Sequence, residues 1–339
     1  MYRIIRVLLL ELWIGSTITV FASVFVYFTI GCIAAFAIFS LGMTAVLYNA
    51  QDLLLYYPND PPDSRHFVLQ PCNYGLPYET IKVKTKDGQR IHMFFIKQET
   101  GSSRKATMIF FHGNAGNMGQ RLSNVSGFYH QLGINILMVE YRGYGLSEGT
   151  PSEHGFYIDA QTAFNYLVQR TDIDRDKIFL FGRSLGGAVA IDLATEKFYR
   201  CKFWAVIVEN TFTSIPDMAQ VILKWRLLRW VPMWFYKNRY MSLHKICRLT
   251  APTLFICGEN DTLVPPGMTR ALHRHCRSPW KQLLLLRGGH DDTWLCRDYY
   301  PALQQFLRDL PAVAENNSRY DTNKCDEERR PGFNVVHTV

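Results

Sequence analysis

The 339-residue sequence contains a long stretch without charge, since no Asp, Glu, Lys or Arg and no proline occurs from Leu12 to Ala50. This run is too long for the core of a signal peptide or for a buried helix of a soluble domain. One tilted membrane span needs about 20–25 residues, and two spans with a turn need about 40. A hairpin would favour a polar turn, but only Gly31 and Cys32 lie near the middle. The sequence therefore favours one span, from roughly Phe21 to Leu47, over two.

The charges that flank this span predict its orientation. Arg3 and Arg6 precede it, whereas the first charged residues after it are acidic: Asp52, Asp60 and Asp63. The asymmetry predicts a single-pass type II membrane protein, with a signal-anchor, a cytosolic amino terminus and a lumenal or extracellular domain after the span. Two Asn-X-Ser tripeptides, which begin at Asn124 and Asn316, are possible glycosylation sites that fit this orientation.

Signatures of metal and nucleic-acid binding are also missing. Neither H-E-x-x-H nor C-x-x-C occurs in the sequence, so no metal or other cofactor is expected. The formal net charge is +8, but no nucleic-acid reading motif accompanies it, so nucleic acid is not an expected partner. Outside the apolar run the cysteines are odd in number and lack the short spacings of a disulfide framework.

The most informative pattern runs from Ile178 to Gly187 and reads I-F-L-F-G-R-S-L-G-G. Its four apolar residues predict a short buried strand, and the apolar sequence from Ala188 predicts a helix. A glycine-flanked serine between a strand and a helix is typical of a nucleophile elbow, whose tight turn excludes flanking side chains and exposes the serine hydroxyl. Ser184 is therefore the candidate nucleophile, with Gly182 and Gly186 as the elbow glycines. The alternative is a glycine-rich turn that only packs.

The other members of a catalytic triad are expected later in the chain, the acid before the histidine. Asp261 follows the predicted strand 253–257, at the end where open α/β sheets place active sites. His290 follows the next predicted strand, 281–286, in a Gly-Gly-His loop. Asp261 would orient His290, which would take the proton from Ser184. Glu259 is the rival acid, and Asp261 is preferred because it comes later in the loop, just before a Leu-Val-Pro segment.

Acyl transfer also needs backbone donors for the tetrahedral oxyanion. The turn after the predicted strand 108–111 reads H-G-N-A-G-N, and its small residues would let the N–H of Asn114 point at the site. The N–H of Leu185, directly after the candidate nucleophile, would be the second donor. His112 opens this turn and is interpreted as structural rather than catalytic.

Together these motifs resemble those of the α/β-hydrolase superfamily over about Tyr78 to Leu310. The resemblance rests on the H-G-N-A-G-N turn, the Y-R-G-Y-G sequence after Glu140, the elbow, the acid loop and the histidine loop, in that order. Glu140 stands where such sequences often have Asp. The resemblance implies an α/β-hydrolase fold, with a mostly parallel eight-stranded sheet, helices on both faces and a small helical cap. An N-terminal transmembrane helix would precede it.

The motifs also predict how the chain is divided. The expected segments are a cytosolic tip and signal-anchor at 1–50, a linker at 51–77, a hydrolase domain at 78–312 with a cap insertion at about 212–248, and a polar tail at 313–339.

The expected cap contains a segment from Val221 to Tyr240 that has no acidic residue. It interleaves aromatic and cationic residues: Trp225, Trp230, Trp234, Phe235 and Tyr236 with Lys224, Arg226, Arg229, Lys237 and Arg239. This mixture suits a membrane interface, an acyl pocket or a grip on an anionic head group. The alternative is a helix that packs its aromatic residues on the core and extends its cations into water.

The sequence therefore predicts a membrane-anchored serine hydrolase that cleaves an acyl ester or thioester through an acyl-enzyme. Membrane attachment and the aromatic cap favour a lipid, a lysolipid or another acylated substrate. An amidase or peptidase with the same triad is the enzymatic alternative. A non-catalytic binding module is the other alternative, although such modules usually lose the serine, the histidine or the elbow glycines, all of which are present.

Overall fold

The computed structural model describes residues 12–224 and 230–317. The predicted cytosolic tip before residue 12 and most of the predicted polar tail lie outside this range. Two compact units divide the described chain: residues 58–224 with 240–317, which hold the sheet, and residues 12–57 with 230–239.

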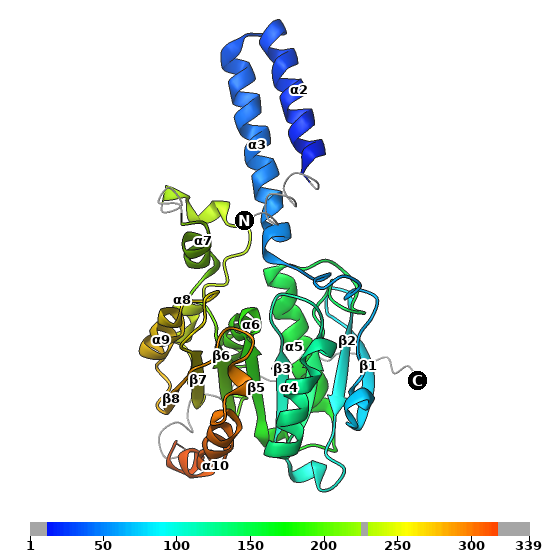
Figure 1. Ribbon diagram of the computed structural model, residues 1–339, viewed down its shortest axis with the longest axis vertical. Coiled ribbons are helices and arrows are strands. Elements are labelled where there is room, and N and C mark those ends of the chain that lie inside the picture. Colours follow the sequence, from blue (N-terminus) through cyan, green and yellow to red (C-terminus); the bar gives the residue numbers. More distant parts are fainter. Residues whose placement is uncertain (1–11, 225–229, 318–339) are drawn as a thin grey trace. The chain divides into compact units, whose positions relative to one another are not determined.

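Eight strands form a single sheet in the order β1-β2-β4-β3-β5-β6-β7-β8 (Figure 1). β2 is antiparallel to β1 and to β4, and all the other neighbours are parallel. The predicted mostly parallel eight-stranded sheet is thus confirmed. The strands are β1 Tyr78–Lys84, β2 Arg90–Ile96, β3 Thr107–Phe111, β4 Asn135–Val139, β5 Ile178–Arg183, β6 Ala205–Glu209, β7 Thr253–Gly258 and β8 Lys281–Leu286.

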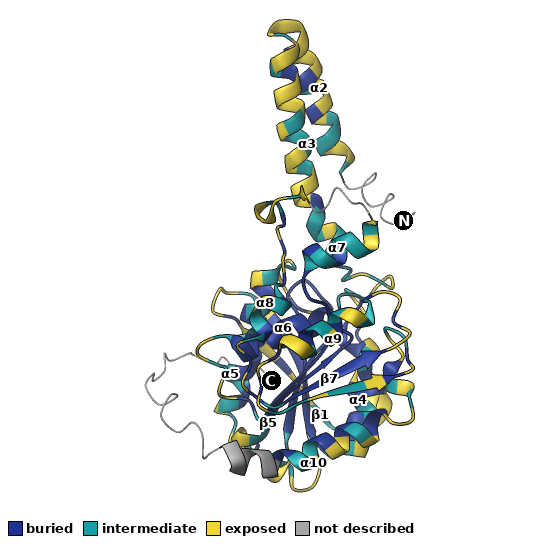
Figure 2. Ribbon diagram, turned by 90° about the vertical axis from the view of Figure 1, so that its left-hand side faces the viewer, coloured by how far each residue is buried: buried dark blue, intermediate teal, exposed yellow. Residues whose placement is uncertain are grey.

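Helices cover both faces of the sheet, so its inner strands are continuously apolar rather than alternating. Every residue of β3, β4 and β6 is buried, and so is every residue of β5 and β7, which Figure 2 labels and shows in dark blue. The main helices of this unit are α4 Leu122–Gly127, η4 Phe128–Leu132, α5 Glu153–Gln169, α6 Leu185–Thr195, α7 Ile215–Leu223, α8 Ser242–Ile246, α9 Pro266–His275 and α10 Tyr299–Asn317. Single turns lie at η1 Pro71–Tyr74, η2 Ser102–Arg104, η3 Met118–Arg121, η5 Arg175–Lys177 and η8 Thr293–Leu295.

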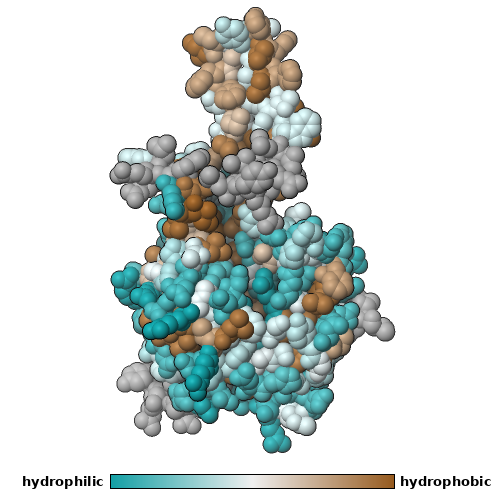
Figure 3. Space-filling model, in the orientation of Figure 1, coloured by the Kyte–Doolittle hydropathy of each residue, from teal (hydrophilic) through white to brown (hydrophobic). Residues whose placement is uncertain are grey.

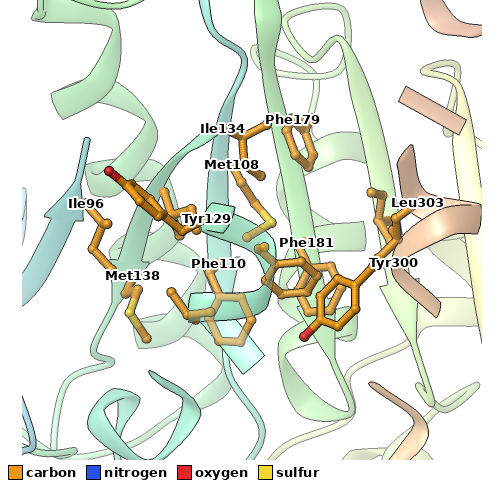
Figure 4. Close-up of a cluster of buried hydrophobic side chains, with 14 of the residues drawn as sticks. Ile96, Met108, Phe110, Tyr129, Ile134, Met138, Phe179, Phe181, Tyr300 and Leu303 are labelled. Atoms are coloured by element: carbon orange, nitrogen blue, oxygen red, sulfur yellow. The ribbon is translucent and has the colours of Figure 1, made fainter. Parts of the chain in front are cut away.

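Alternate strand residues show which helices lie on which face. Leu254 and Ile256 of β7 belong to a buried cluster with η4 and α10, whereas Phe255 between them contacts His273 of α9, with ring centroids 5.5 Å apart. In the first cluster the rings of Phe110 and Phe181 stack at 5.2 Å (Figure 4). α4, η4 and α10 therefore cover one face, and α5, α6 and α9 cover the other.

The amino-terminal unit corrects the prediction of one helix from Phe21 to Leu47. Two helices are present, α2 Trp13–Thr29 and α3 Cys32–Leu55, with a break at Ile30 and Gly31. Gly31 has φ 122° and ψ 173°, a conformation open to glycine but strained for other residues, and it ends the helix without a polar turn. In the described part of the chain, α3 is the helix with the length and apolarity of a membrane span, and α2 is a shorter apolar helix.

Small residues bring α2 and α3 close together. A Cβ added to Gly42 would lie 2.4 Å from Thr19 Cγ2, and one added to Gly15 would lie 3.2 Å from Val46 Cγ2. The hydroxyls of Thr19 and Ser23 donate to backbone carbonyls four residues earlier on α2, at 2.8 and 2.7 Å. Small and hydroxyl-bearing residues at a helix contact are typical of pairs that pack inside membranes.

The outer surface of this helix pair is apolar (Figure 3). Its exposed aromatic residues include Phe21, Phe28 and Phe36, which are 71%, 80% and 72% accessible. Water would solvate this surface poorly, so the surface fits a hydrocarbon environment.

The sheet contains one buried histidine with an unusual environment. His92 of β2 is 2% exposed, and neither of its ring nitrogens has a hydrogen-bond partner among the described residues. Burial, with a smaller contribution from the charge of Lys82, lowers the pKa of His92 from 6.5 to about 4. The ring is therefore neutral in the folded protein at neutral pH.

Replacing His92 with Gln should flatten the dependence of unfolding free energy on pH. Between pH 6.5 and about 4 the unfolded histidine is protonated while the folded one is not, so wild-type stability falls as the pH falls through this window. The full effect is about 3 kcal/mol. Urea unfolding of both proteins at several pH values would measure it. Identical pH slopes would contradict the assignment.

Candidate active site

Ser184 lies at the sharp junction between β5 and α6. Its backbone has φ 54° and ψ −118°, which is strained for a residue with a side chain. Neighbouring backbone holds it there: Ser184 N–H donates to the Glu209 carbonyl at 2.9 Å, and the Ser184 carbonyl accepts from Thr211 Oγ1 at 2.7 Å. The end of β6 therefore maintains the conformation of the elbow.

The two elbow positions have no space for a side chain. A Cβ on Gly182 would lie 2.2 Å from the Gly186 carbonyl oxygen, and a Cβ on Gly186 would lie 2.1 Å from the Phe111 carbonyl oxygen. Both obstacles are backbone atoms, which cannot rotate away. The sequence G-x-S-x-G here thus reflects close contact between α6, β5 and the end of β3.

Asp261 and His290 are brought together from separate loops. Asp261 Oδ2 lies 2.7 Å from His290 Nδ1, while its Oδ1 accepts from the N–H groups of Leu263 and Val264 at 2.9 and 2.8 Å. These bonds use both carboxylate oxygens and orient the ring of His290. The rival acid, Glu259, instead lies 3.2 Å from Arg270 at the surface.

Strand order explains why these residues share one region. Ser184, Asp261 and His290 follow β5, β7 and β8, which run parallel within the order β5-β6-β7-β8. Carboxyl ends of parallel strands meet at one edge of a sheet, where open α/β folds place their sites. His290 keeps 12% of its side chain exposed and Asp261 only 1%, an arrangement in which the ring has solvent access and its carboxylate partner does not.

The H-G-N-A-G-N turn lies against the elbow. A Cβ on Gly113 would be 3.7 Å from the Cβ of Ser184, so the turn passes directly beside the serine. Asn114 follows Gly113, and its carbonyl accepts from the hydroxyl of Tyr144 at 2.8 Å. Leu185 is the first residue of α6, whose N-terminal dipole favours negative charge.

The side chains of His112 and Glu140 stabilise this turn from inside the protein core. Both side chains are fully buried, and His112 Nε2 lies 3.0 Å from Glu140 Oε1. The two oxygens of Glu140 also accept from the N–H of Met118, at 3.3 and 3.1 Å. The interpretation of His112 as structural fits this burial. Glu140, which the sequence analysis named only as a departure from the family pattern, supports the turn.

Asn210 is a second residue whose role the sequence analysis missed. Its side-chain Oδ1 accepts from the N–H of Gly258 at 2.7 Å. Its Nδ2 donates to the carbonyls of Gly289 and His290 and to Thr293 Oγ1, at 3.1, 3.0 and 2.9 Å. One amide thus joins the loop that carries Asp261 to the loop that carries His290. The sequence did offer one indication of this role: Asn210 directly follows β6, at the edge of the sheet where Ser184, Asp261 and His290 also lie.

A buried ionic network of Arg183, Glu209 and Tyr299 includes the residue just before Ser184. Arg183 Nε donates to Glu209 Oε1 at 2.9 Å, and the hydroxyl of Tyr299 donates to Glu209 Oε2 at 2.6 Å. Burial raises the pKa of Tyr299 well above its ordinary value, so the phenol stays a neutral donor. The network joins β5, β6 and α10 around the candidate nucleophile.

Asn124 also belongs to this network, which corrects its prediction as a glycosylation site. It is 2% exposed, its Nδ2 donates to the Tyr300 hydroxyl at 2.9 Å, and its Oδ1 accepts from Arg183 Nη2 at 2.8 Å. A glycan on this amide would have to displace α10. The second tripeptide, at Asn316, ends at Ser318, which lies outside the described residues.

Comparison with known proteins identifies the family. The chain is 35% identical to protein bem46 of Schizosaccharomyces pombe, over 79% of this chain and 90% of that protein. It is 38% identical to the α/β-hydrolase domain-containing protein WAV2 of Arabidopsis thaliana, over 78% and 89%. The chain belongs to the α/β-hydrolase family. Residues 102–248 of the hydrolase also match a family model described as serine aminopeptidase, S33.

Solved structures agree with the fold of this hydrolase. The esterase Pf2001 of Pyrococcus furiosus superposes with a TM-score of 0.59 at 18% identity, covering 71% of the hydrolase and 96% of the esterase. At this identity the match supports the fold alone.

A third relative comes from yeast. The Saccharomyces cerevisiae protein YNL320W, described as a membrane protein, is 34% identical over 78% of the hydrolase and 90% of its own length. In the described part of this chain, α3 is long and apolar enough to cross a membrane. Among the described residues, no group of three or more His, Cys, Asp or Glu side chains could hold a metal ion.

Replacing Asn210 with Ala should slow reaction of Ser184 with a fluorophosphonate by about 10- to 100-fold, because both partner loops lose their shared support. Unfolding free energy should also fall by about 1–3 kcal/mol, since the N–H of Gly258 loses its acceptor. Labelling rates and thermal unfolding would be measured in parallel. Asn165→Ala is the matched control, because the Asn165 amide donates to the Tyr199 hydroxyl at 3.3 Å and lies in α5, outside both loops of the candidate site. Equal labelling rates for the two variants would contradict the positioning role.

Proposed function

We propose that this α/β-hydrolase is a membrane-anchored serine hydrolase that cleaves an acyl ester or thioester. The observation that carries the proposal is the elbow serine at the same sheet edge as a hydrogen-bonded Asp261–His290 pair. An elbow serine needs a base, and a histidine oriented by a buried carboxylate is the usual one.

The proposed reaction has two halves. His290 accepts the proton of Ser184 as Oγ attacks the acyl carbonyl carbon, and Asp261 stabilises the imidazolium that results. The oxyanion accepts hydrogen bonds from the backbone N–H groups of Asn114 and Leu185. Each bond contributes about 3–4 kcal/mol to stabilisation of the transition state. Collapse breaks the ester or thioester bond, and the leaving alcohol or thiol takes the proton from His290. Water then attacks the acyl-enzyme with His290 as base, which releases the acid and restores Ser184.

Membrane anchoring supports an acyl substrate that resides in or beside a bilayer: a lipid, a lysolipid or an acylated protein. α3 would keep the enzyme at the surface where such substrates are concentrated. An amidase or peptidase would use the same residues to cleave an amide bond, whose amine is a poorer leaving group than an alcohol or a thiol. No metal or other cofactor enters either scheme, and nucleic acid has no part in it.

Replacing Ser184 with Ala should abolish labelling of the full-length protein by a fluorophosphonate. Asp261→Asn should lower hydrolysis of an activated acyl ester by about 10⁴-fold, because the ring of His290 then loses its oriented tautomer. Glu259→Gln is the control and should retain wild-type activity, since Glu259 pairs with Arg270 at the surface. Hydrolysis rates against ester, thioester and amide substrates of one acyl group would separate the enzymatic alternatives. A folded wild type without labelling or turnover would support a binding module instead.

Two topologies follow from the two amino-terminal helices. If α3 alone spans the bilayer, the basic amino terminus remains cytosolic and the single-pass type II protein has a lumenal or extracellular catalytic domain. If α2 also crosses, the chain returns and the domain shares the cytosolic side with Arg3 and Arg6. The close contact of Thr19 with Gly42 favours this hairpin as a second candidate.

Labelling of Cys201, an exposed thiol of the catalytic unit, separates the two topologies. In sealed vesicles with the cytosolic face outward, a membrane-impermeant maleimide should reach Cys201 only after permeabilisation if the protein is single-pass. The hairpin predicts labelling without permeabilisation. The modified peptide would be identified by mass spectrometry, with Cys201→Ser as the control.

A further inference from the structure

Hydrogen bonds join part of the cap insertion to the last two turns of α3, within one structural unit. Gln51 Nε2 donates to the carbonyl of Phe235 at 2.8 Å, and Gln51 Oε1 accepts from the N–H of Lys237 at 2.9 Å. One side-chain amide thereby pairs with the backbone of the cap in both directions. Figure 2 shows the exposed segment beside the lower end of α3.

Asp52 of α3 and Tyr56, directly after α3, complete this contact, which we call the α3 clamp: Gln51, Asp52 and Tyr56. Asp52 Oδ1 accepts from Asn238 Nδ2 at 2.6 Å, and its other oxygen pairs with the ammonium of Lys237. The hydroxyl of Tyr56 donates to Asn238 Oδ1 at 2.9 Å. Asn238 and Tyr56 are both buried, so the clamp is a built contact rather than a chance approach at the surface.

The clamp marks a particular depth along α3. Asp52 is the first charged residue after the charge-free run, so α3 leaves the hydrocarbon near this point. Tyr48 lies one turn earlier and its ring centroid is 6.2 Å from that of Phe235. Tyrosine and tryptophan concentrate where hydrocarbon meets head groups. The clamp therefore holds the cap segment at the level of the membrane interface.

The segment just before the clamp exposes large side chains at that level. Trp230, Met233 and Trp234 are 82%, 43% and 69% accessible. Three such residues within one short segment form an apolar surface of the kind that marks an interaction site. A bilayer that surrounds α3 would extend to the level of this segment. A phospholipid bilayer is therefore the partner that fits the apolar surface of the segment.

We propose that residues 230–235 form an interfacial anchor that inserts Trp230 and Trp234 into the head-group region of a phospholipid bilayer, with the α3 clamp setting its depth. The inference rests on the proposed membrane anchoring by α3. The proposal assigns the insertion to the aromatic side chains, and the nearby charge of Lys237 is paired with Asp52. The cations Arg226 and Arg229 of the cap lie outside the described residues.

Fluorescence quenching in full-length protein tests the anchor. The protein would be reconstituted in nanodiscs of phosphatidylcholine, with or without bromine on the acyl chains near the head group. The emission lost in a Trp230→Phe, Trp234→Phe double variant reports these two indoles. Brominated lipid should quench that component by about half, as expected for indoles at the interface. The emission lost in Trp280→Phe is the control and should be unchanged, because Trp280 packs in the core of the sheet unit.

A Phe36→Trp variant separates failure of the anchor from failure of membrane attachment. Phe36 is exposed on α3, so an indole there should be quenched if α3 lies in the bilayer. Quenching at residue 36 without quenching of Trp230 and Trp234 would overturn the interfacial anchor alone. No quenching at residue 36 would overturn the membrane anchoring on which it rests. Quenching of the two tryptophans only after anionic lipid is added would overturn the aromatic mechanism.

The clamp itself is tested by its removal. Replacing Gln51 and Asp52 together with Ala should at least halve the quenching of Trp230 and Trp234 while leaving an indole at residue 36 quenched as before. Asn49→Ala is the matched control on the same helix, since the Asn49 amide donates to the Ala45 carbonyl of α3 and belongs to no bond of the clamp among the described residues. Unchanged quenching in the double variant would show that the clamp does not set the depth of the segment.

Discussion

The contact between the start of α6 and the end of β3 is the constraint on which the candidate site depends. At Gly186 the helix approaches the Phe111 carbonyl so closely that no side chain fits between them. This approach forces the backbone of Ser184 into its strained conformation and places the H-G-N-A-G-N turn beside it. The buried groups of Glu209 in β6, Arg183 in β5 and Glu140 directly after β4 then stabilise that arrangement.

Local patterns predicted four strands of the sheet unit, at 108–111, 178–181, 253–257 and 281–286, and the helix after the elbow. Continuous apolar runs predict strands when both faces are covered, and the strand predicted at 281–286 is β8. The elbow, the acid loop and the histidine loop follow strands whose order could be expected from the family resemblance. The distance between His290 and Asp261 was not predictable, because it depends on how two loops pack in three dimensions.

Features that depend on long-range contacts were missed or misinterpreted. Asn124 fits a glycosylation tripeptide, and only its packing against Tyr300 and Arg183 shows that its amide is buried. The role of Asn210 could not be inferred from its sequence neighbours, because its bonding partners lie far along the chain. A turn at Gly31 was rejected because a hairpin was expected to need polar residues there, and a glycine within apolar sequence also occurs inside continuous membrane helices.

The amide of Asn210 also bears on how the protein is made. It connects the end of β6 to loops that follow β7 and β8, so its bonds form only when the carboxyl-terminal strands have joined the sheet. A nascent chain that has exposed the elbow but still holds β8 in the ribosomal exit tunnel lacks the His290 loop. The serine would remain inert through most of synthesis, and activity would begin only once the last strand docks.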